Sequence, residues 1–153
     1  MTTIAYDGTT IAADTLSTYD MERCAVPKKK IRVENGVVFA LTGAGRFYDA
    51  LVKWFFDGAD TENMPKGKSG DYGYSLIVID EDGVRSYNDD CGYPNWFKEQ
   101  KMAWGTGQDY AMGAMYAGAD AESAVKVACM LDIKSGGAVQ VVNVEQLVRR
   151  QAA

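Results

Sequence analysis

The sequence predicts an α+β fold in which two antiparallel sheets carry helices on their outer faces. The first observation is a set of turn signals between β-rich runs, namely Asp7-Gly8, Asn35-Gly36 and Asp82-Gly83. The second is the order of the expected elements, which is strands, a helix, strands, two helices and a strand. The third is size, because 153 residues with 47% hydrophobic content can form the core of one domain, residues 1–153.

The first half of the chain is expected to consist mainly of hairpins. Runs rich in Thr and Ile flank Asp7-Gly8, so residues 1–14 should form a hairpin that starts at the N-terminus. Residues 15–25 are polar and show no clean period, which indicates a loop or an irregular strand. Residues 28–33 and 37–42 should pair around Asn35-Gly36. The three lysines at 28–30 are typical of a solvated strand edge or end.

The second half alternates helices with strands. Apolar residues at helical spacing predict a helix over 46–58, and the polar residues 59–73 predict an exposed loop. Strands are expected at 74–79, 84–88, 102–104 and 138–144, with an irregular packed loop at 91–101 that contains Pro94. Helices are expected at 108–117, at 121–131 with Asp120 as its N-cap, and at 145–150.

Composition excludes several classes of protein. Sixteen basic against 21 acidic residues give a net charge of −5, which argues against nucleic-acid binding. The chain has no apolar run long enough for a membrane span and no signal-peptide pattern, so we expect a cytoplasmic location. Cys24, Cys91 and Cys129 lack the spacing of a disulfide framework or a zinc site, and we expect no metal and no cofactor.

The absence of histidine restricts the possible chemistry. Without His, every Ser-His or Cys-His arrangement is excluded, so the general base of an enzyme must be an amine or a carboxylate. Thr2 follows Met1, and an initiator methionine before a small residue is normally removed. An N-terminal Thr2 would carry both a hydroxyl nucleophile and an amine base. The alternative is that Thr2 and Thr3 are ordinary strand residues.

Further segments join Thr2 in a recognisable order. Asp14 ends the second strand, Lys30 follows it by sixteen residues within Lys29-Lys30-Ile31, and a glycine-rich segment follows the next strand. The remaining segments are Thr42-Gly43-Ala44-Gly45, Gly105-Thr106-Gly107 and Asp132-Ile133-Lys134-Ser135-Gly136-Gly137. Together they resemble the proteasome β-type family, which includes bacterial HslV and belongs to the N-terminal-nucleophile hydrolases. The resemblance covers nearly the whole chain and implies a four-layer αββα sandwich of two antiparallel sheets.

The resemblance implies a threonine-type endopeptidase and a role for each matched residue. The Gly43 N–H would stabilise the oxyanion, and an ammonium at Lys30 would lower the pKa of the Thr2 α-amine by like-charge repulsion. The implied catalytic residues are Thr2, Asp14, Lys30, Thr106, Asp132 and Ser135. The implied substrate-binding residues are Ser17, Thr18, Lys28, Arg32, Leu41 and Gly45. Because Lys28 and Arg32 are cationic, we expect acidic or small residues on the acyl side of the cleaved bond, unless both cations turn outward or pair with a carboxylate of a neighbouring subunit.

The resemblance also implies a ring of identical subunits that acts on peptides or unfolded proteins. A lone subunit would expose Trp54, Phe55 and Phe56 or other helical faces, which also predicts self-association. Family members usually carry two long helices between the oxyanion segment and the next strand. Here only residues 46–58 are expected to be helical, and residues 59–72 are too short and too polar for a second helix, so ring geometry and docking of an ATPase unfoldase stay open. The alternatives are a catalytically inactive structural subunit and an amidase that acts on small amides.

Overall fold

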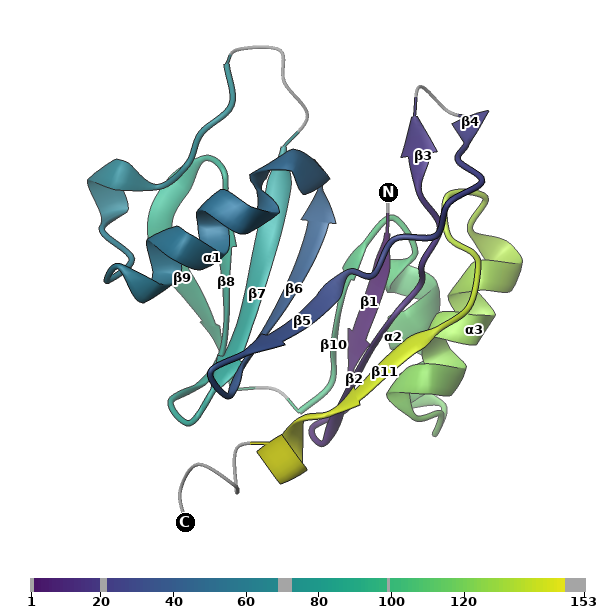
Figure 1. Ribbon diagram of the computed structural model, residues 1–153. Coiled ribbons are helices and arrows are strands. Elements are labelled where there is room, and N and C mark those ends of the chain that lie inside the picture. The colour runs from purple at the N-terminus through teal and green to yellow at the C-terminus, as the bar shows by residue number, and fades with distance from the viewer. Residues whose placement is uncertain (1, 20–21, 69–72, 99, 148–153) are drawn as a thin grey trace.

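Two antiparallel sheets lie face to face with helices on both outer sides, as Figure 1 shows for the computed structural model. The structure describes residues 2–19, 22–68, 73–98 and 100–147. One sheet has the order β10 (Met102–Gly105), β1 (Thr3–Tyr6), β2 (Thr10–Ala13) and β11 (Gln140–Asn143). The other has the order β5 (Ile31–Glu34), β6 (Val37–Gly43), β7 (Tyr74–Asp80), β8 (Gly83–Asn88) and β9 (Cys91–Phe97). The expected αββα sandwich is confirmed.

The helices cover the outer faces because alternate strand residues point to them. In β6, Val38 and Ala40 face the other sheet, whereas Phe39 and Leu41 pack against α1 (Tyr48–Phe56). Burying one such apolar side chain contributes about 1.5–3 kcal/mol. On the four-stranded sheet the outward residues are small, such as Ala5 of β1, which lets the remaining helices pack closely. These helices are α2 (Gln108–Tyr116) and α3 (Ala121–Leu131).

The predicted hairpins around residues 7–8 and 35–36 are confirmed. Ile4 pairs with Ala13 across the first hairpin, and Val33 pairs with Val38 across the second. The Asp7 carboxylate closes the first turn by accepting hydrogen bonds from the backbone N–H groups of Thr9 and Thr10. Its other oxygen accepts from the Ala121 N–H at the start of α3, so this turn also positions a helix.

The region expected to be an irregular loop at 91–101 is instead largely the strand β9, and this prediction was wrong. Pro94 argued against a strand, but β9 lies at the edge of its sheet. A proline is tolerated there, because its missing N–H can be on the side that has no neighbouring strand. The pairing with β8 also shifts register between Ser86 and Asn88, opposite the part of β9 that contains Pro94. An edge position and a bulge together accommodate the proline.

The strand predicted at 28–33 begins only at Ile31, and Lys30 is buried, whereas Lys28 and Lys29 are exposed as predicted for a solvated strand end. Residues 15–25 contain a two-stranded ribbon, β3 (Thr18–Tyr19) with β4 (Glu22–Arg23). The predicted C-terminal helix is helical over 144–147, and its remainder lies outside the described residues.

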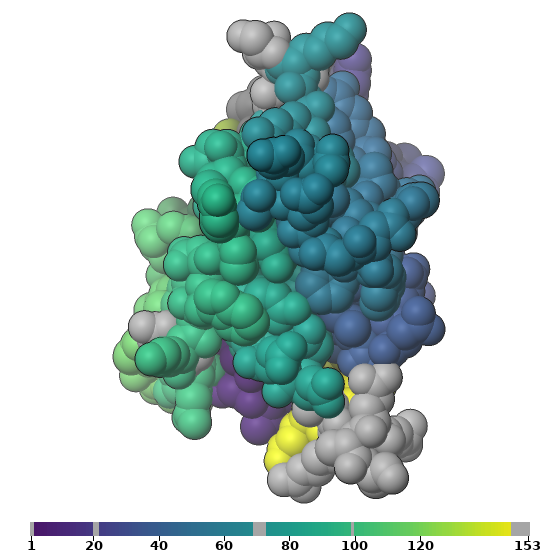
Figure 2. Space-filling view, turned by 90° about the vertical axis from the view of Figure 1, so that its left-hand side faces the viewer, coloured from purple at the N-terminus to yellow at the C-terminus, as the bar shows by residue number. Residues whose placement is uncertain are grey.

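The segment between β6 and β7 is short, as predicted. Its described residues contain α1 and two 3₁₀ turns, Gly45–Phe47 and Thr61–Asn63. Trp54 was expected on the surface but is buried, with its indole N–H donating to the Asp60 carbonyl at 2.8 Å. Phe56, the last residue of α1, is 43% exposed. Figure 2 shows the face of the molecule that α1 and the five-stranded sheet form. No helix in the described part of the chain is long and apolar enough to cross a membrane.

Candidate active site

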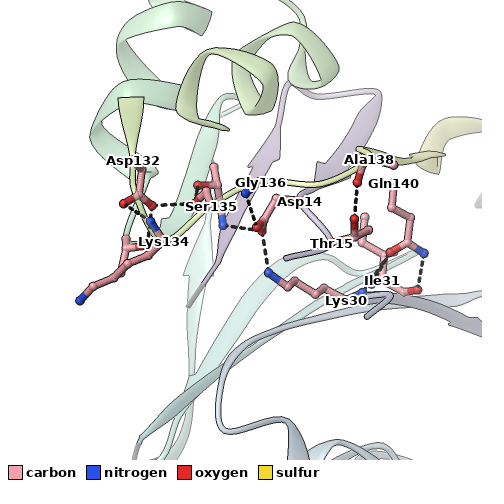
Figure 3. Close-up of polar contacts among 12 residues, drawn as sticks. Asp14, Thr15, Lys30, Ile31, Asp132, Lys134, Ser135, Gly136, Ala138 and Gln140 are labelled. Atoms are coloured by element: carbon pink, nitrogen blue, oxygen red, sulfur yellow. Dashed lines mark hydrogen bonds and ion pairs between the residues drawn. The ribbon is translucent and has the colours of Figure 1, made fainter. Parts of the chain in front are cut away.

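A buried carboxylate lies where β2 ends. Asp14 is fully buried, and its Oδ1 accepts hydrogen bonds from Lys30 Nζ at 2.7 Å and from the Thr3 backbone N–H at 2.9 Å. Its Oδ2 accepts from the Gly136 N–H at 3.1 Å, so three separate segments converge on one side chain (Figure 3). Both oxygens of this buried carboxylate therefore have hydrogen-bond donors from the protein, and the carboxylate holds the lysine in place.

Lys30 is held through its backbone as well as through its side chain. The Gln140 side-chain oxygen accepts from the N–H groups of Lys30 and Ile31, and its amide group donates to the Ile31 carbonyl. On the other side, the Tyr48 hydroxyl donates to the Lys30 carbonyl at 2.8 Å. Burial lowers the pKa of the Lys30 ammonium below its ordinary value, although the Asp14 carboxylate opposes this shift. The lysine is therefore fixed between both sheets.

A second polar group links the turn before α2 with the segment after α3. Asp132 Oδ2 accepts from Thr106 Oγ1 at 2.7 Å and from Ser135 Oγ at 2.6 Å. Burial raises the pKa of Asp132, but the hydrogen bonds from Ser135 and Thr106 and the charge of Lys134 outweigh it and leave the pKa lowered. Asp132 is therefore an anion at neutral pH and can orient both hydroxyl groups.

Thr3 extends this group into the first strand. Its Oγ1 lies 2.7 Å from Ser135 Oγ, and both side chains are fully buried. A serine hydroxyl has one proton, and Ser135 donates it to Asp132, so Thr3 must be the donor to Ser135. The result is a directed chain of hydrogen bonds from Thr3 through Ser135 to Asp132.

Two glycines allow the turn that carries Thr106 to approach β1. A Cβ at Gly107 would lie 2.0 Å from Thr3 Oγ1, and a Cβ at Gly105 would lie 1.8 Å from the Thr2 carbonyl oxygen. No larger residue fits at either position without moving the strand. The Gly-Thr-Gly pattern thus brings the Thr106 hydroxyl within reach of Asp132.

A cleft of about 1050 Å³ opens beside these groups. Thr2, Lys30 and Gly43 line it, and Thr2 itself is only 3% exposed. All the residues expected to bind substrate line the same cleft, namely Ser17, Thr18, Lys28, Arg32, Leu41 and Gly45. Asp14 and Ser135 are fully buried, and neither they nor Asp132 and Thr106 line the cleft. The predicted residues thus divide into a cleft lining and a group of polar residues behind it.

Arg32 has a partner that the sequence did not indicate. Its guanidinium forms an ion pair with Asp49 of α1 in the same chain and lies 4.0 Å from the centre of the Tyr48 ring. Sequence reasoning also missed Thr3, Gln140 and Tyr48. Only Thr3 carried a signal, because it directly follows the candidate nucleophile.

Comparisons with known proteins agree with this architecture. No protein-family model matches the sequence, and a search of curated proteins gives no match. Among solved structures, Thiobacillus denitrificans BPH is 22% identical with a TM-score of 0.66, covering 94% of this chain and 97% of that one. The same protein in complex with epoxomicin is 21% identical, with a TM-score of 0.65 and coverage of 94% and 98%. Eukaryotic HslV from Trypanosoma brucei is 19% identical, with a TM-score of 0.69 and coverage of 92% and 99%. The chain shares the fold of these proteins over nearly its whole length.

Proposed function

We propose that this chain is a proteasome β-type N-terminal-nucleophile hydrolase, a threonine peptidase whose Thr2 becomes the N-terminus when Met1 is removed. The observation that carries the proposal is the buried Lys30–Asp14 pair, with its lysine lining the same cleft as Thr2. Its fold, shared with HslV and BPH, supports the same assignment. The cleft is large enough for an extended peptide, which favours a peptidase over an amidase for small amides.

In the proposed reaction, Thr2 Oγ1 attacks the carbonyl carbon of the scissile bond while the Thr2 α-amine accepts the hydroxyl proton, directly or through one water. The positive charge of Lys30 lowers the pKa of this amine below its ordinary value of about 7.7–8.0, so that it is neutral at pH 7. Asp14 keeps Lys30 oriented and does not itself transfer the proton.

The Gly43 N–H stabilises the tetrahedral oxyanion at the edge of the cleft. The intermediate collapses to an ester on Thr2, and the leaving amine receives the proton from the α-amine. The same α-amine then removes a proton from water, which hydrolyses the ester and restores the Thr2 hydroxyl. Thr106, Asp132 and Ser135, which are hydrogen-bonded to one another and contact β1 through Thr3, are the residues that position the amine and its proton in this reaction.

Substitution of the nucleophile tests this proposal. Thr2→Ala should lose hydrolysis of fluorogenic peptides entirely but keep the fold, because a strand position tolerates Ala, whereas Thr2→Ser should retain measurable turnover. Thr9→Ala, at an exposed turn, is the matched control and should behave as the wild type. Intact mass should show loss of one methionine, and epoxomicin, which BPH binds, should inhibit the wild type. Wild-type turnover by Thr2→Ala would exclude the mechanism.

The proposal includes a cytoplasmic homo-oligomeric ring that degrades unfolded polypeptides. An inactive structural subunit is less consistent with the structure, because a scaffold gains nothing from a fully buried carboxylate bonded to a buried lysine. A partner ATPase is compatible with such a ring, and the short segment between β6 and β7 leaves less surface for docking it.

A further inference from the structure

The cleft is strongly cationic although the chain as a whole is acidic. Of the described residues that line it, six are cationic and none is Asp or Glu. These cations are Arg23, Lys28, Lys29, Lys30, Arg32 and Lys134. The whole chain, by contrast, has a formal charge of −5. A concave surface lined by one sign of charge concentrates its electric field and attracts ligands of the opposite sign.

Among the described residues, two of the six cations have a carboxylate partner and four have none. Lys30 pairs with Asp14, and Arg32 pairs with Asp49. Within the described ranges, no carboxylate lies within ion-pair distance of the other four. Lys134 does influence the Asp132 carboxylate, but that group already accepts hydrogen bonds from two hydroxyls and the Lys134 backbone.

The four available cations come from separate segments that meet at the cleft. Arg23 belongs to β4, Lys28 and Lys29 precede β5, and Lys134 follows α3. Hydrogen bonds donated by backbone N–H groups fix two of these segments, from Lys28 to the Thr15 carbonyl at 2.9 Å and from Lys134 to the Asp132 carboxylate at 3.1 Å. The charges are therefore spread along the cleft rather than confined to one pocket.

From this arrangement we infer that the cleft binds acidic polypeptide segments, with Glu or Asp at several neighbouring positions of the substrate. The inference rests on the proposed function for hydrolysis, but not for binding. Four like charges in one cleft repel one another, and substrate carboxylates relieve that repulsion. An apolar or amide side chain at the same positions gives no such relief, so it is discriminated against.

Two labelled peptides of equal length test the inference, one with Glu at the variable positions and one with Gln. Binding is followed by fluorescence anisotropy and hydrolysis by product formation, each in about 0.05 M and about 0.5 M NaCl. We expect kcat/KM for the Glu peptide to exceed that for the Gln peptide by about tenfold at low salt, since each exposed charge pair can change affinity by up to about fivefold. The preference should shrink at high salt.

Charge-matched variants locate the effect. The double variant Lys28→Ser/Lys29→Ser should reduce the Glu preference to about twofold. The control Lys53→Ser/Lys126→Ser removes the same charge from α1 and α3, outside the cleft, and should keep the preference. If the double variant does not fold, the salt titration of the wild type still decides whether the preference is electrostatic.

The outcomes separate this inference from the proposed function. Equal hydrolysis of both peptides, or faster hydrolysis of the Gln peptide, overturns the acidic preference and leaves the peptidase intact. Tight, salt-sensitive binding of the Glu peptide without hydrolysis supports the acidic preference and overturns the peptidase. An equal loss of preference in the control variant also overturns the inference, because the effect would then belong to the overall charge.

Discussion

At the scale of single residues, Thr3 contributes more to the site than its position in a strand indicates. Its backbone N–H donates to Asp14, its carbonyl accepts from the Asp14 N–H, and its hydroxyl donates to Ser135. Thr3 is therefore bonded directly to Asp14 and, through the Ser135 hydroxyl, to the carboxylate of Asp132. These two groups are linked through the residue that follows the proposed nucleophile.

Thr3→Val tests this link, because valine keeps the shape and removes the hydroxyl. The Ser135 oxygen would lose its donor inside the protein, which should lower the free energy of unfolding by about 1–2 kcal/mol. Misorientation of Ser135 should lower kcat more than it changes KM. Urea denaturation and peptide kinetics measure both effects, with exposed Thr9→Val as the control. Unchanged stability and kcat in Thr3→Val would show that the hydroxyl chain has no role.

At the scale of elements, the sequence predicts a strand or turn correctly when the interactions that form it lie within a few residues of the chain. The hairpins at residues 7–8 and 35–36 follow from turn chemistry within a few residues, so the sequence is enough. The strand β9 depends on its place at a sheet edge, which no local pattern around Pro94 contains. The burial of Lys30 likewise depends on Asp14, Gln140 and Tyr48 from distant segments.

The site shows the same division. The sequence pattern selected Asp14 with Lys30, and the structure places these two in contact. The contacts of Thr3, Gln140 and Asp49 with the site were not predictable, because they arise when the sheets and α1 pack together. Catalytic roles for the matched residues remain a proposal supported by this geometry.

A buried ion pair joins the strands β7, β8 and β9. Arg85 is only 6% exposed and donates to both carboxylate oxygens of Asp80 at 2.9 and 2.8 Å. Its guanidinium also lies 4.7 Å from the centre of the Trp96 ring in β9 and 5.1 Å from that of Phe55 in α1. Because the Arg85 side chain contacts β7, β9 and α1, loss of Asp80 should weaken the packing of β7, β8 and β9 together.

Asp80→Asn should lower the free energy of unfolding by about 3 kcal/mol at pH 7, since it leaves a buried guanidinium without a counter-charge. Asp82→Asn, in the exposed part of the same turn, is the control and should change stability by less than about 0.5 kcal/mol. Chemical denaturation of both variants measures the difference. Equal stabilities would show that the pair contributes nothing.

The same pair predicts a dependence on pH. Burial raises the pKa of Asp80, but the hydrogen bonds and charge of Arg85 lower it by more, so the folded pKa lies below the unfolded value of about 3.9. The stabilisation is therefore complete above about pH 4 and is lost as the pH falls through the lowered folded pKa. The stability difference between the wild type and Asp80→Asn should accordingly shrink in strong acid.

At the scale of the whole molecule, apolar side chains at the end of α3 are exposed to solvent. Met130, Leu131 and Ile133 are 76%, 57% and 77% exposed, within four consecutive residues. Monomeric proteins rarely expose contiguous apolar surface of several hundred Å². Ile133 also lines the cleft, so a second subunit bound here would lie next to the proposed substrate-binding site.

We therefore expect the chain to self-associate through this surface. Sedimentation velocity at about 1–100 μM should show species well above the 16.7 kDa of one chain. Met130→Glu/Leu131→Glu should shift them to monomer, because burying two carboxylates in an apolar contact is costly. Tyr93→Glu, exposed on β9, is the control and should leave association unchanged.

A wild type that sediments as a monomer throughout this range contradicts a ring. If the contact at Ile133 shapes the cleft, the peptidase activity per chain should fall on dilution in parallel with the loss of the larger species.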